Sequence, residues 1–277
     1  MEYKNITDVK KPVSRIVFGT ATPAMLRGEN VFRMLDEVFA AGINTFDTAR
    51  AYGMAEKALG AWMTARGCRD KVVILAKGAH PLPGSKEPRV TPGAIREDVE
   101  KSLKMLGTSF LDIYMLHRDN PRVPVGPLVE TLNELREEGK IGTFGGSNWS
   151  YGRIDEANEY AYAHDMFGFD VSSPAYSLVR QKEDPWGFGC VDLSGREHSA
   201  ERAWYQDKGV EVFAYASLGH GFLSGKFLAS EAKRAAKFLD GYGVKGYLCP
   251  QNLQCLARAE KIAHKKHVTV PQVALAW

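Results

Sequence analysis

Seven short segments of the chain are rich in apolar and β-branched residues, and most of them are continuous apolar runs rather than alternating ones. Continuous runs are typical of strands that are covered by helices on both faces, as in parallel sheets. We expect strands over residues 15–20, 44–48, 71–77, 111–117, 142–147, 169–173 and 211–216.

The segments between these strands carry the start and stop signals of amphipathic helices. The clearest case has Thr91 and Pro92 at the N-cap and first helical position and Gly107 at the C-terminal end. Apolar residues recur between them at intervals of four, four and three residues, at Ile95, Val99, Leu103 and Leu106. Similar segments end at Gly42 and Gly139, and Ser150 fits the N-cap of a further helix.

Strands that alternate with helices form either an open doubly wound sheet or a closed barrel. An open sheet that binds a dinucleotide has a glycine fingerprint after its first strand, and residues 19–23 (Gly-Thr-Ala-Thr-Pro) do not fit it. The one GxGxxG, at residues 241–246, does not follow a predicted strand, so we expect a loop there. We therefore predict a (β/α)₈ TIM barrel, with residues 1–277 as a single domain.

In such a barrel, catalytic residues lie at the C-terminal ends of the strands. Asp47, Lys77 and His117 each lie at such an end, and Tyr52 follows in the loop beyond Asp47. One interpretation is structural, with an Asp47–Lys77 ion pair and a core histidine. Because all four residues occur at successive strand ends, we favour a catalytic interpretation.

These four side chains suit proton transfer to a carbonyl oxygen. A tyrosine hydroxyl is a weak acid, and we expect the Lys77 ammonium to lower the pKa of Tyr52 toward neutrality. Asp47 would hold the ammonium charged, and a neutral His117 imidazole would orient the substrate oxygen. The group received at the carbonyl carbon would be a hydride from a nicotinamide cofactor.

The composition of the chain narrows the classes of function that the protein can have. The chain has 36 Lys and Arg against 33 Asp and Glu, a net charge of +3 with no concentrated basic block, which argues against a nucleic-acid partner. The polar N-terminus and the short apolar runs indicate a soluble cytoplasmic protein without a membrane partner. We expect no metal site, since Cys249, Cys255, His264 and His267 match no zinc-ligand spacing.

The segments around the four residues resemble the aldo-keto reductases. They are residues 46–53 (Phe-Asp-Thr-Ala-Arg-Ala-Tyr-Gly), 76–78 (Ala-Lys-Gly), 116–117 (Leu-His) and 146–148 (Gly-Ser-Asn), and the similarity extends from Gly19 to Trp277. The resemblance implies an NAD(P)H-dependent carbonyl reductase with Tyr52 as general acid, assisted by Lys77, Asp47 and His117. It also implies cofactor contacts, including stacking of Tyr215 on the nicotinamide, from Gly19, Thr20, Ser147, Asn148, Ser173, Tyr215, Leu218 and Gly219.

The sequence departs from the family pattern at two places. Ser173 lies where the family usually has a glutamine, and Ala216-Ser217 replace the usual Ser-Pro after the stacking tyrosine. We also expect the chain to lack the last strand–helix unit of the barrel, which carries the residues that distinguish NADP from NAD. NADP(H) is the commoner family choice, and NAD(H) remains possible.

Two long insertions, 81–89 and 178–199, are expected near the catalytic face, with Trp186 and Phe188 as candidates for the wall of a substrate pocket. A small loop core is the alternative. The expected substrate is a small aldehyde or ketone, with sugar-derived carbonyl compounds included, that is reduced to the alcohol. The alternatives are a Schiff-base lyase or aldolase that uses Lys77, and a non-catalytic cofactor-binding regulatory subunit.

Overall fold

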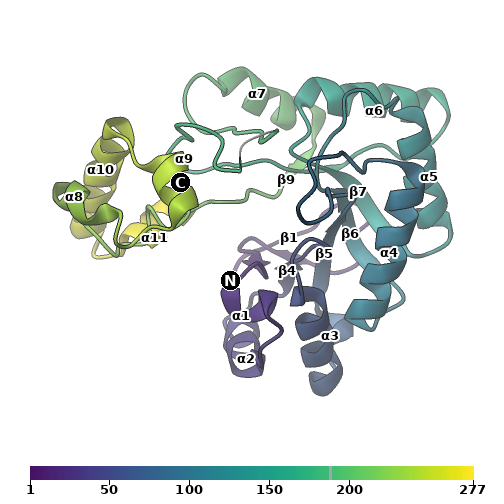
Figure 1. Cartoon of the computed structure of the whole chain (residues 1–277), viewed down its shortest axis with the longest axis horizontal. Coiled ribbons are helices and arrows are strands. Elements are labelled where there is room, and N and C mark those ends of the chain that lie inside the picture. Colours follow the sequence, from purple (N-terminus) through teal and green to yellow (C-terminus); the bar gives the residue numbers. More distant parts are fainter. Residues whose placement is uncertain (187–188) are drawn as a thin grey trace. The chain divides into compact units, whose positions relative to one another are not determined.

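The computed structural model describes residues 1–186 and 189–277 of the 277-residue chain (Figure 1). The chain divides into two compact units, Met1–Ser172 and Ser173–Trp277. The first unit carries most of the strands, and the second consists largely of helices and connecting segments.

All seven predicted strands are present, although most are shorter than expected. They are β3 (Phe18–Gly19), β4 (Thr45–Asp47), β5 (Val73–Gly78), β6 (Leu111–Leu116), β7 (Ile141–Ser147), β8 (Val171–Ser173) and β9 (Glu211–Val212). Their order in the sheet follows the sequence, β3-β4-β5-β6-β7-β8-β9, and neighbours from β3 to β7 pair in parallel. Sequential parallel order is the topology of a (β/α)₈ barrel, which confirms the predicted fold class.

A short hairpin at the N-terminus was not predicted. Strands β1 (Tyr3–Lys4) and β2 (Val13–Ser14) pair antiparallel. Two-residue strands are too short to produce a periodic pattern, so the sequence carries no clear signal for them. The hairpin is attached to the sheet, because the Ser14 N–H donates to Asn44 Oδ1 at 3.0 Å, immediately before β4.

The helices of the first unit follow the predicted alternation. They are α1 (Pro23–Leu26), α2 (Phe32–Ala40), α3 (Ala55–Arg66), α4 (Pro92–Leu106), α5 (Gly126–Glu137) and α6 (Tyr151–Ala163), with a 3₁₀ turn η1 (Arg69–Lys71). Helices α3, α4, α5 and α6 pack side by side in this order (Figure 1). Helices α3, α4 and α5 each connect two neighbouring parallel strands, as a barrel requires.

The predicted helix caps are confirmed. The Thr91 hydroxyl accepts a hydrogen bond from the Ala94 N–H at 3.3 Å, and Ser150 accepts from Arg153 in the same way. Gly107 ends α4 in the left-handed conformation, with φ of 64°. These local signals correctly placed both ends of α4 and the start of α6.

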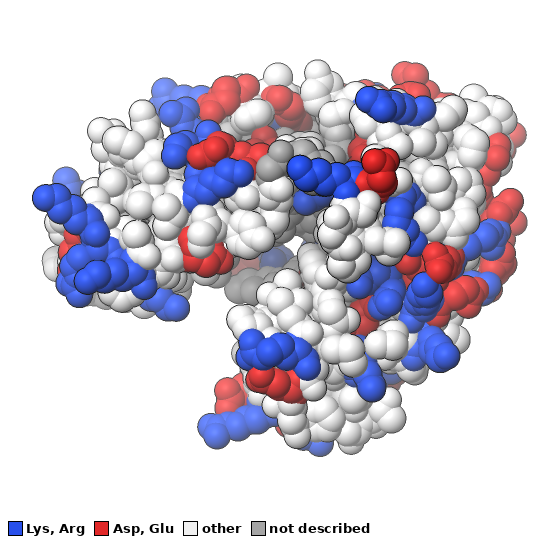
Figure 2. All heavy atoms as spheres, viewed as in Figure 1, with Lys and Arg blue, Asp and Glu red and all other residues white. Residues whose placement is uncertain are grey.

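The helical face of the first unit carries charges of both signs (Figure 2). Arg96 of α4 pairs with Glu134 and with Glu138, the latter at 2.8 Å, and Lys140 pairs with Glu100 at 2.5 Å. In the second unit, Lys and Arg residues gather over α8 and α10 (Figure 2). Basic residues in the last turn of α10 are favourable there, because that end of a helix carries a partial negative charge.

The second unit has its own hydrophobic core. Its helices are α7 (Ser199–Lys208), α8 (Ala232–Ala235), α9 (Gly241–Tyr247), α10 (Pro250–Lys266) and α11 (Val270–Ala276), with a 3₁₀ turn η2 (Ala229–Glu231). The buried core residues are Val179, Phe222, Leu223, Phe227, Ala235, Leu239, Tyr247, Leu256 and Ala274. Val179 belongs to the insertion 178–199, so this insertion contributes to the core of the second unit.

The GxGxxG segment is helical, so the prediction of a loop over 241–246 is wrong. It forms α9, and the Asp240 carboxylate accepts a hydrogen bond from the Gly243 N–H at 2.6 Å as an N-cap. A Cβ atom at Gly243 would lie 2.9 Å from the His220 carbonyl oxygen. The glycine therefore allows a close approach of the backbone within a capped helix.

Among the described residues, no helix has both the length and the apolar composition needed to cross a bilayer.

Candidate active site

Asp47 is the last residue of β4 and Lys77 is the last but one of the adjacent parallel strand β5, and their side chains form an ion pair. The Lys77 side chain is only 4% exposed, and that of Asp47 is 19% exposed. Burial by itself would lower the pKa of the Lys77 ammonium, but Asp47 and Tyr52 outweigh it, and the net pKa is raised. Lys77 is therefore a buried cation at neutral pH.

Tyr52 lies in the loop between β4 and α3, beside this ion pair. Lys77 Nζ is 5.5 Å from the centroid of the Tyr52 ring. The next residue, Gly53, has φ of 52°, and a Cβ atom there would lie 2.6 Å from the Leu26 carbonyl oxygen. Glycine thus allows the tight turn that carries Tyr52 onto the strand ends.

The pKa of Tyr52 differs from the sequence-based expectation. Burial raises the pKa of the hydroxyl, and the Lys77 ammonium lowers it only in part, so that the net pKa lies above its ordinary value of 10. The prediction that the pKa of Tyr52 is lowered is therefore wrong in this structure. Tyr52 is therefore a protonated phenol at neutral pH, as a proton donor has to be.

His117 directly follows β6, and its backbone N–H donates to the Gly78 carbonyl oxygen at 2.8 Å. The ring lies edge-on to Tyr52, with centroids 5.6 Å apart and an interplanar angle of 83°. Burial, with help from Lys77, holds the pKa of the His117 imidazole well below its usual range, so the ring is neutral. Within the described part of the chain its buried Nδ1 has no hydrogen-bond partner.

The structure thus brings together all four residues that the strand-end argument selected. Asp47 contacts Lys77, Lys77 lies beside Tyr52, and Tyr52 packs against His117. An ammonium, a phenol and a neutral imidazole at one edge of a parallel sheet can polarise a carbonyl group and protonate its oxygen.

Ser147 and Asn148 end the next strand, β7, and are 1% and 6% exposed. Asn148 Nδ2 donates to Ser147 Oγ at 3.1 Å, and Asn148 has φ of 60°, a left-handed conformation that asparagine tolerates better than most residues. The Trp149 indole then donates to the Arg118 carbonyl oxygen at 3.1 Å. This bond links the end of β7 to the residue after His117.

Gly19 and Thr20 lie at the same edge, at the end of β3. The Thr20 N–H donates to the Asp47 carbonyl oxygen at 2.9 Å. In the described chain, the buried hydroxyls of Thr20 and Thr48 have no hydrogen-bond partner. Buried polar atoms are normally paired, so orphaned hydroxyls beside the Asp47–Lys77 pair fit an edge that receives a polar ligand.

The remaining predicted residues belong to the second unit. Ser173 is 1% exposed, and Tyr215 follows β9 in a bridge with Ala175. Gly219 has φ of 58°, and Leu218 packs against the core of this unit. Trp186 contacts Tyr215, at 5.7 Å between ring centroids, and also the rings of His220 and Tyr242. Phe188 lies outside the described residues.

The sequence analysis missed His80. Its ring packs on that of His117, with centroids 4.7 Å apart and an interplanar angle of 61°. The signal was its position three residues after Lys77, immediately before the insertion 81–89 that was already assigned to the catalytic face. Among the described residues, no group of three or more His, Cys, Asp and Glu residues could hold a metal ion.

Comparison with known proteins gives the family of the chain. The model of the aldo/keto reductase family matches residues 15–277. The chain is 29% identical to aldo-keto reductase str7 of Strobilurus tenacellus, over 89% of this chain and 68% of that protein. It is 30% identical to aldo-keto reductase YhdN of Bacillus subtilis, over 82% of this chain and 65% of that protein.

A second kind of relative is also similar. A probable voltage-gated potassium channel subunit beta of Oryza sativa is 26% identical, with 100% of this chain and 83% of that protein covered. From the family match and the barrel topology, we conclude that the chain belongs to the aldo/keto reductase family, whose members are (β/α)₈-barrel oxidoreductases that generally use NAD(P)H.

Proposed function

We propose that this protein reduces an aldehyde or ketone to the alcohol with NAD(P)H, by hydride transfer, with Tyr52 as the proton donor. The observation that carries the proposal is the contact series Asp47–Lys77–Tyr52–His117 at the carboxyl edge of the sheet. The name of the family supports an oxidoreductase, and these side chains support carbonyl reduction in particular.

Each of the four residues has one task in the proposed reaction. When bound, the nicotinamide supplies a hydride to the carbonyl carbon. The Tyr52 hydroxyl gives its proton to the carbonyl oxygen, and the resulting tyrosinate is stabilised by the adjacent Lys77 ammonium until it regains a proton from solvent. The neutral His117 imidazole orients the oxygen, and Asp47 keeps Lys77 charged and in place.

Residues at the sheet edge could hold the cofactor. We propose that Ser147 and Asn148 bind the nicotinamide carboxamide, because both are buried polar groups at the strand end next to His117. Gly19 and Thr20 would contact the cofactor through their backbone and the orphaned Thr20 hydroxyl. The family resemblance adds further candidates, with Tyr215 as the stacking ring: Ser173, Tyr215, Leu218 and Gly219.

NADP(H) is the proposed cofactor, and a small carbonyl compound is the proposed substrate, with Trp186 and Phe188 as proposed pocket residues. We also propose a single barrel domain as the working unit. A cytoplasmic location fits the four cysteines, none of which forms a disulfide bond within the described residues.

A titration that follows nicotinamide fluorescence tests cofactor binding. The 277-residue chain is titrated with NADPH and, separately, with NADH. We expect saturable binding of NADPH. Failure to bind either cofactor would overturn the proposed function.

Two other functions remain as alternatives, and both are testable. A Schiff-base lyase needs an uncharged lysine, whereas Asp47 raises the pKa of Lys77, so we expect no borohydride-trapped adduct at Lys77. A non-catalytic subunit is suggested by the names of the channel-subunit relatives. Such a subunit would bind NADPH yet turn over no carbonyl compound.

A further inference from the structure

His80 occupies a place beside the reaction centre that the four catalytic side chains do not account for. Its ring lies edge-on against that of His117, and the residue is partly exposed. Its Nδ1 lies 2.9 Å from the Pro81 carbonyl oxygen. A carbonyl oxygen can only accept, so Nδ1 carries the hydrogen, and the lone pair of the neutral ring is on Nε2.

This Nε2 lone pair is available to a ligand. Among the contacts of the described residues, none is a hydrogen bond to His80 Nε2. Burial lowers the pKa of the His80 imidazole, so at neutral pH the ring is an uncharged acceptor. An accessible acceptor nitrogen next to a catalytic histidine suits recognition of a donor group on the substrate.

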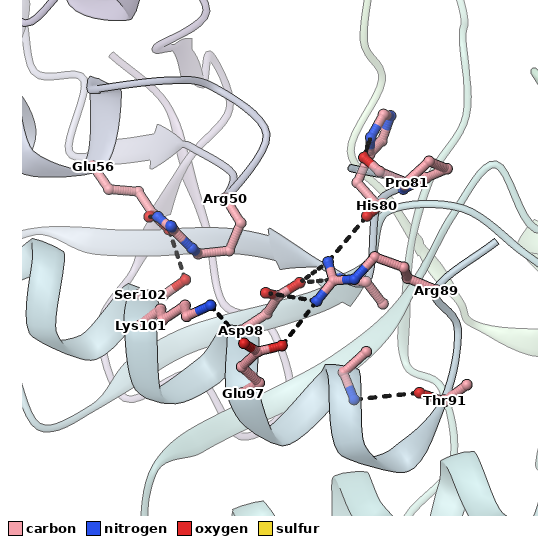
Figure 3. A network of polar contacts seen from close by, with 12 residues as sticks. Arg50, Glu56, His80, Pro81, Arg89, Thr91, Glu97, Asp98, Lys101 and Ser102 are labelled. Atoms are coloured by element: carbon pink, nitrogen blue, oxygen red, sulfur yellow. Dashed lines mark hydrogen bonds and ion pairs between the residues drawn. The ribbon is translucent and has the colours of Figure 1, made fainter. Parts of the chain in front are cut away.

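The backbone that carries His80 is held in an unusual conformation. The preceding residue, Ala79, is fully buried with φ of 58°, a left-handed conformation that is unfavourable for alanine. Its N–H donates to Asp98 Oδ2 at 2.8 Å. Arg89 donates both to Asp98 Oδ2 and to the His80 carbonyl oxygen, each at 3.1 Å (Figure 3). Asp98 and Arg89 together fix the direction in which the His80 ring leaves the backbone.

The same face of α4 also supports the loop of Tyr52. Ser102 lies one turn after Asp98, and its hydroxyl donates to Glu56 at 2.7 Å (Figure 3). The fully buried Glu56 pairs with the Arg50 side chain. The backbone N–H of Arg50 donates to the Lys77 carbonyl oxygen at 2.9 Å. Helix α4 thus holds the loop of His80 through Asp98 and the loop of Tyr52 through Ser102 and Glu56. These contacts set the position of His80 relative to the catalytic residues.

We propose that His80 is a substrate-contacting specificity residue, whose Nε2 accepts a hydrogen bond from a hydroxyl group on the carbon next to the reacting carbonyl. The inference rests on the proposed function. A carbonyl oxygen held by Tyr52 and His117 places the adjoining carbon near the ring that packs on His117. Arg89 and Asp98 are positioning residues that act through His80.

Two aldehydes of similar size test this role. D-glyceraldehyde carries the neighbouring hydroxyl, and propanal lacks it. The measurement is the ratio of their kcat/KM values, compared between wild type and variants, so that intrinsic differences in reactivity cancel. For His80→Phe we expect the ratio to fall about threefold to tenfold, the usual effect of one lost neutral hydrogen bond.

His80→Gln is the matched control, since its amide oxygen can still accept a hydrogen bond, and it should keep more of the wild-type ratio. Arg89→Lys keeps a cation near Asp98 but cannot bridge Asp98 and the His80 carbonyl at once. It should lower the ratio in the same direction as His80→Phe. Thermal unfolding confirms that each variant is folded.

The possible results separate the two proposals. If His80→Phe and Arg89→Lys reduce both kcat/KM values by the same factor, His80 only packs against His117 and the inference is wrong, although the proposed function stands. If wild type binds NADPH but reduces neither aldehyde, the proposed function fails and the inference fails with it. A ratio that falls in His80→Phe and is retained in His80→Gln supports the proposal.

Discussion

The Lys77 ammonium and the Asp47 carboxylate form an ion pair between two adjacent parallel strands, and the lysine is almost completely buried. A buried cation is expensive unless it is paired. The pair therefore makes possible a permanent positive charge beside the Tyr52 hydroxyl.

Lys77→Met should remove the charge that stabilises the Tyr52 tyrosinate. We expect kcat/KM for carbonyl reduction to fall by about 100-fold or more, the usual scale for losing support of an acid–base group. Lys77→Arg keeps the positive charge, so its kcat/KM should fall less than that of Lys77→Met. The measurement is steady-state NADPH oxidation at pH 7, and a Lys77→Met variant with nearly wild-type kcat/KM would contradict the role.

The depressed pKa of His117 predicts how stability depends on pH. The folded protein keeps this imidazole neutral, whereas in the unfolded chain its pKa is near 6.5. The unfolded state therefore binds more protons as the pH falls below about 6.5, and His117 lowers the free energy of unfolding there.

His117→Asn should accordingly lose less stability than wild type between pH 7 and pH 5. Urea unfolding at the two pH values measures this difference, and substitution of the exposed His164 controls for the loss of one imidazole. If His117→Asn and wild type lose the same stability, the neutral, desolvated state assigned to His117 is wrong.

The close packing of Gly78 against the Tyr114 hydroxyl gives a second prediction about stability. The Tyr114 hydroxyl is buried without a hydrogen-bond partner in the described chain, so Tyr114→Phe should raise the free energy of unfolding by about 1 kcal/mol. A Cβ atom at Gly78 would lie 2.1 Å from that hydroxyl oxygen, so Gly78→Ala should destabilise the protein.

The double variant Gly78→Ala/Tyr114→Phe separates this clash from other effects of the extra methyl group. Removal of the hydroxyl relieves the closest contact, and it should recover part of the stability lost in Gly78→Ala. Urea unfolding of the four proteins gives the coupling. Additive effects would show that the Tyr114 hydroxyl is not what excludes a side chain at residue 78.

Much of the fold could be predicted from local sequence signals. The cap at Thr91 and the glycine at 107 define α4 because they satisfy end groups that a helix leaves free. The strand predicted over 111–117 contains an apolar run at 113–116 and corresponds to β6, since a strand covered on both faces needs no polar alternation.

The tertiary contacts could not be predicted in the same way. Residues 241–246 form a helix capped by Asp240, and the close approach of Gly243 to the His220 carbonyl oxygen, which is invisible in the sequence, favours glycine there. His80 was missed because its importance comes from packing on His117, 37 positions away. The pKa of Tyr52 was misjudged because the effect of burial exceeds that of Lys77.

The most direct measurement compares wild type with Tyr52→Phe, in both NADPH binding and NADPH-dependent reduction of D-glyceraldehyde. Loss of a proton donor predicts that the variant binds NADPH with a Kd within about threefold of wild type while kcat/KM falls below detection, at least about 100-fold. Reduction by Tyr52→Phe at a rate near that of wild type would contradict the assignment of Tyr52 as the general acid.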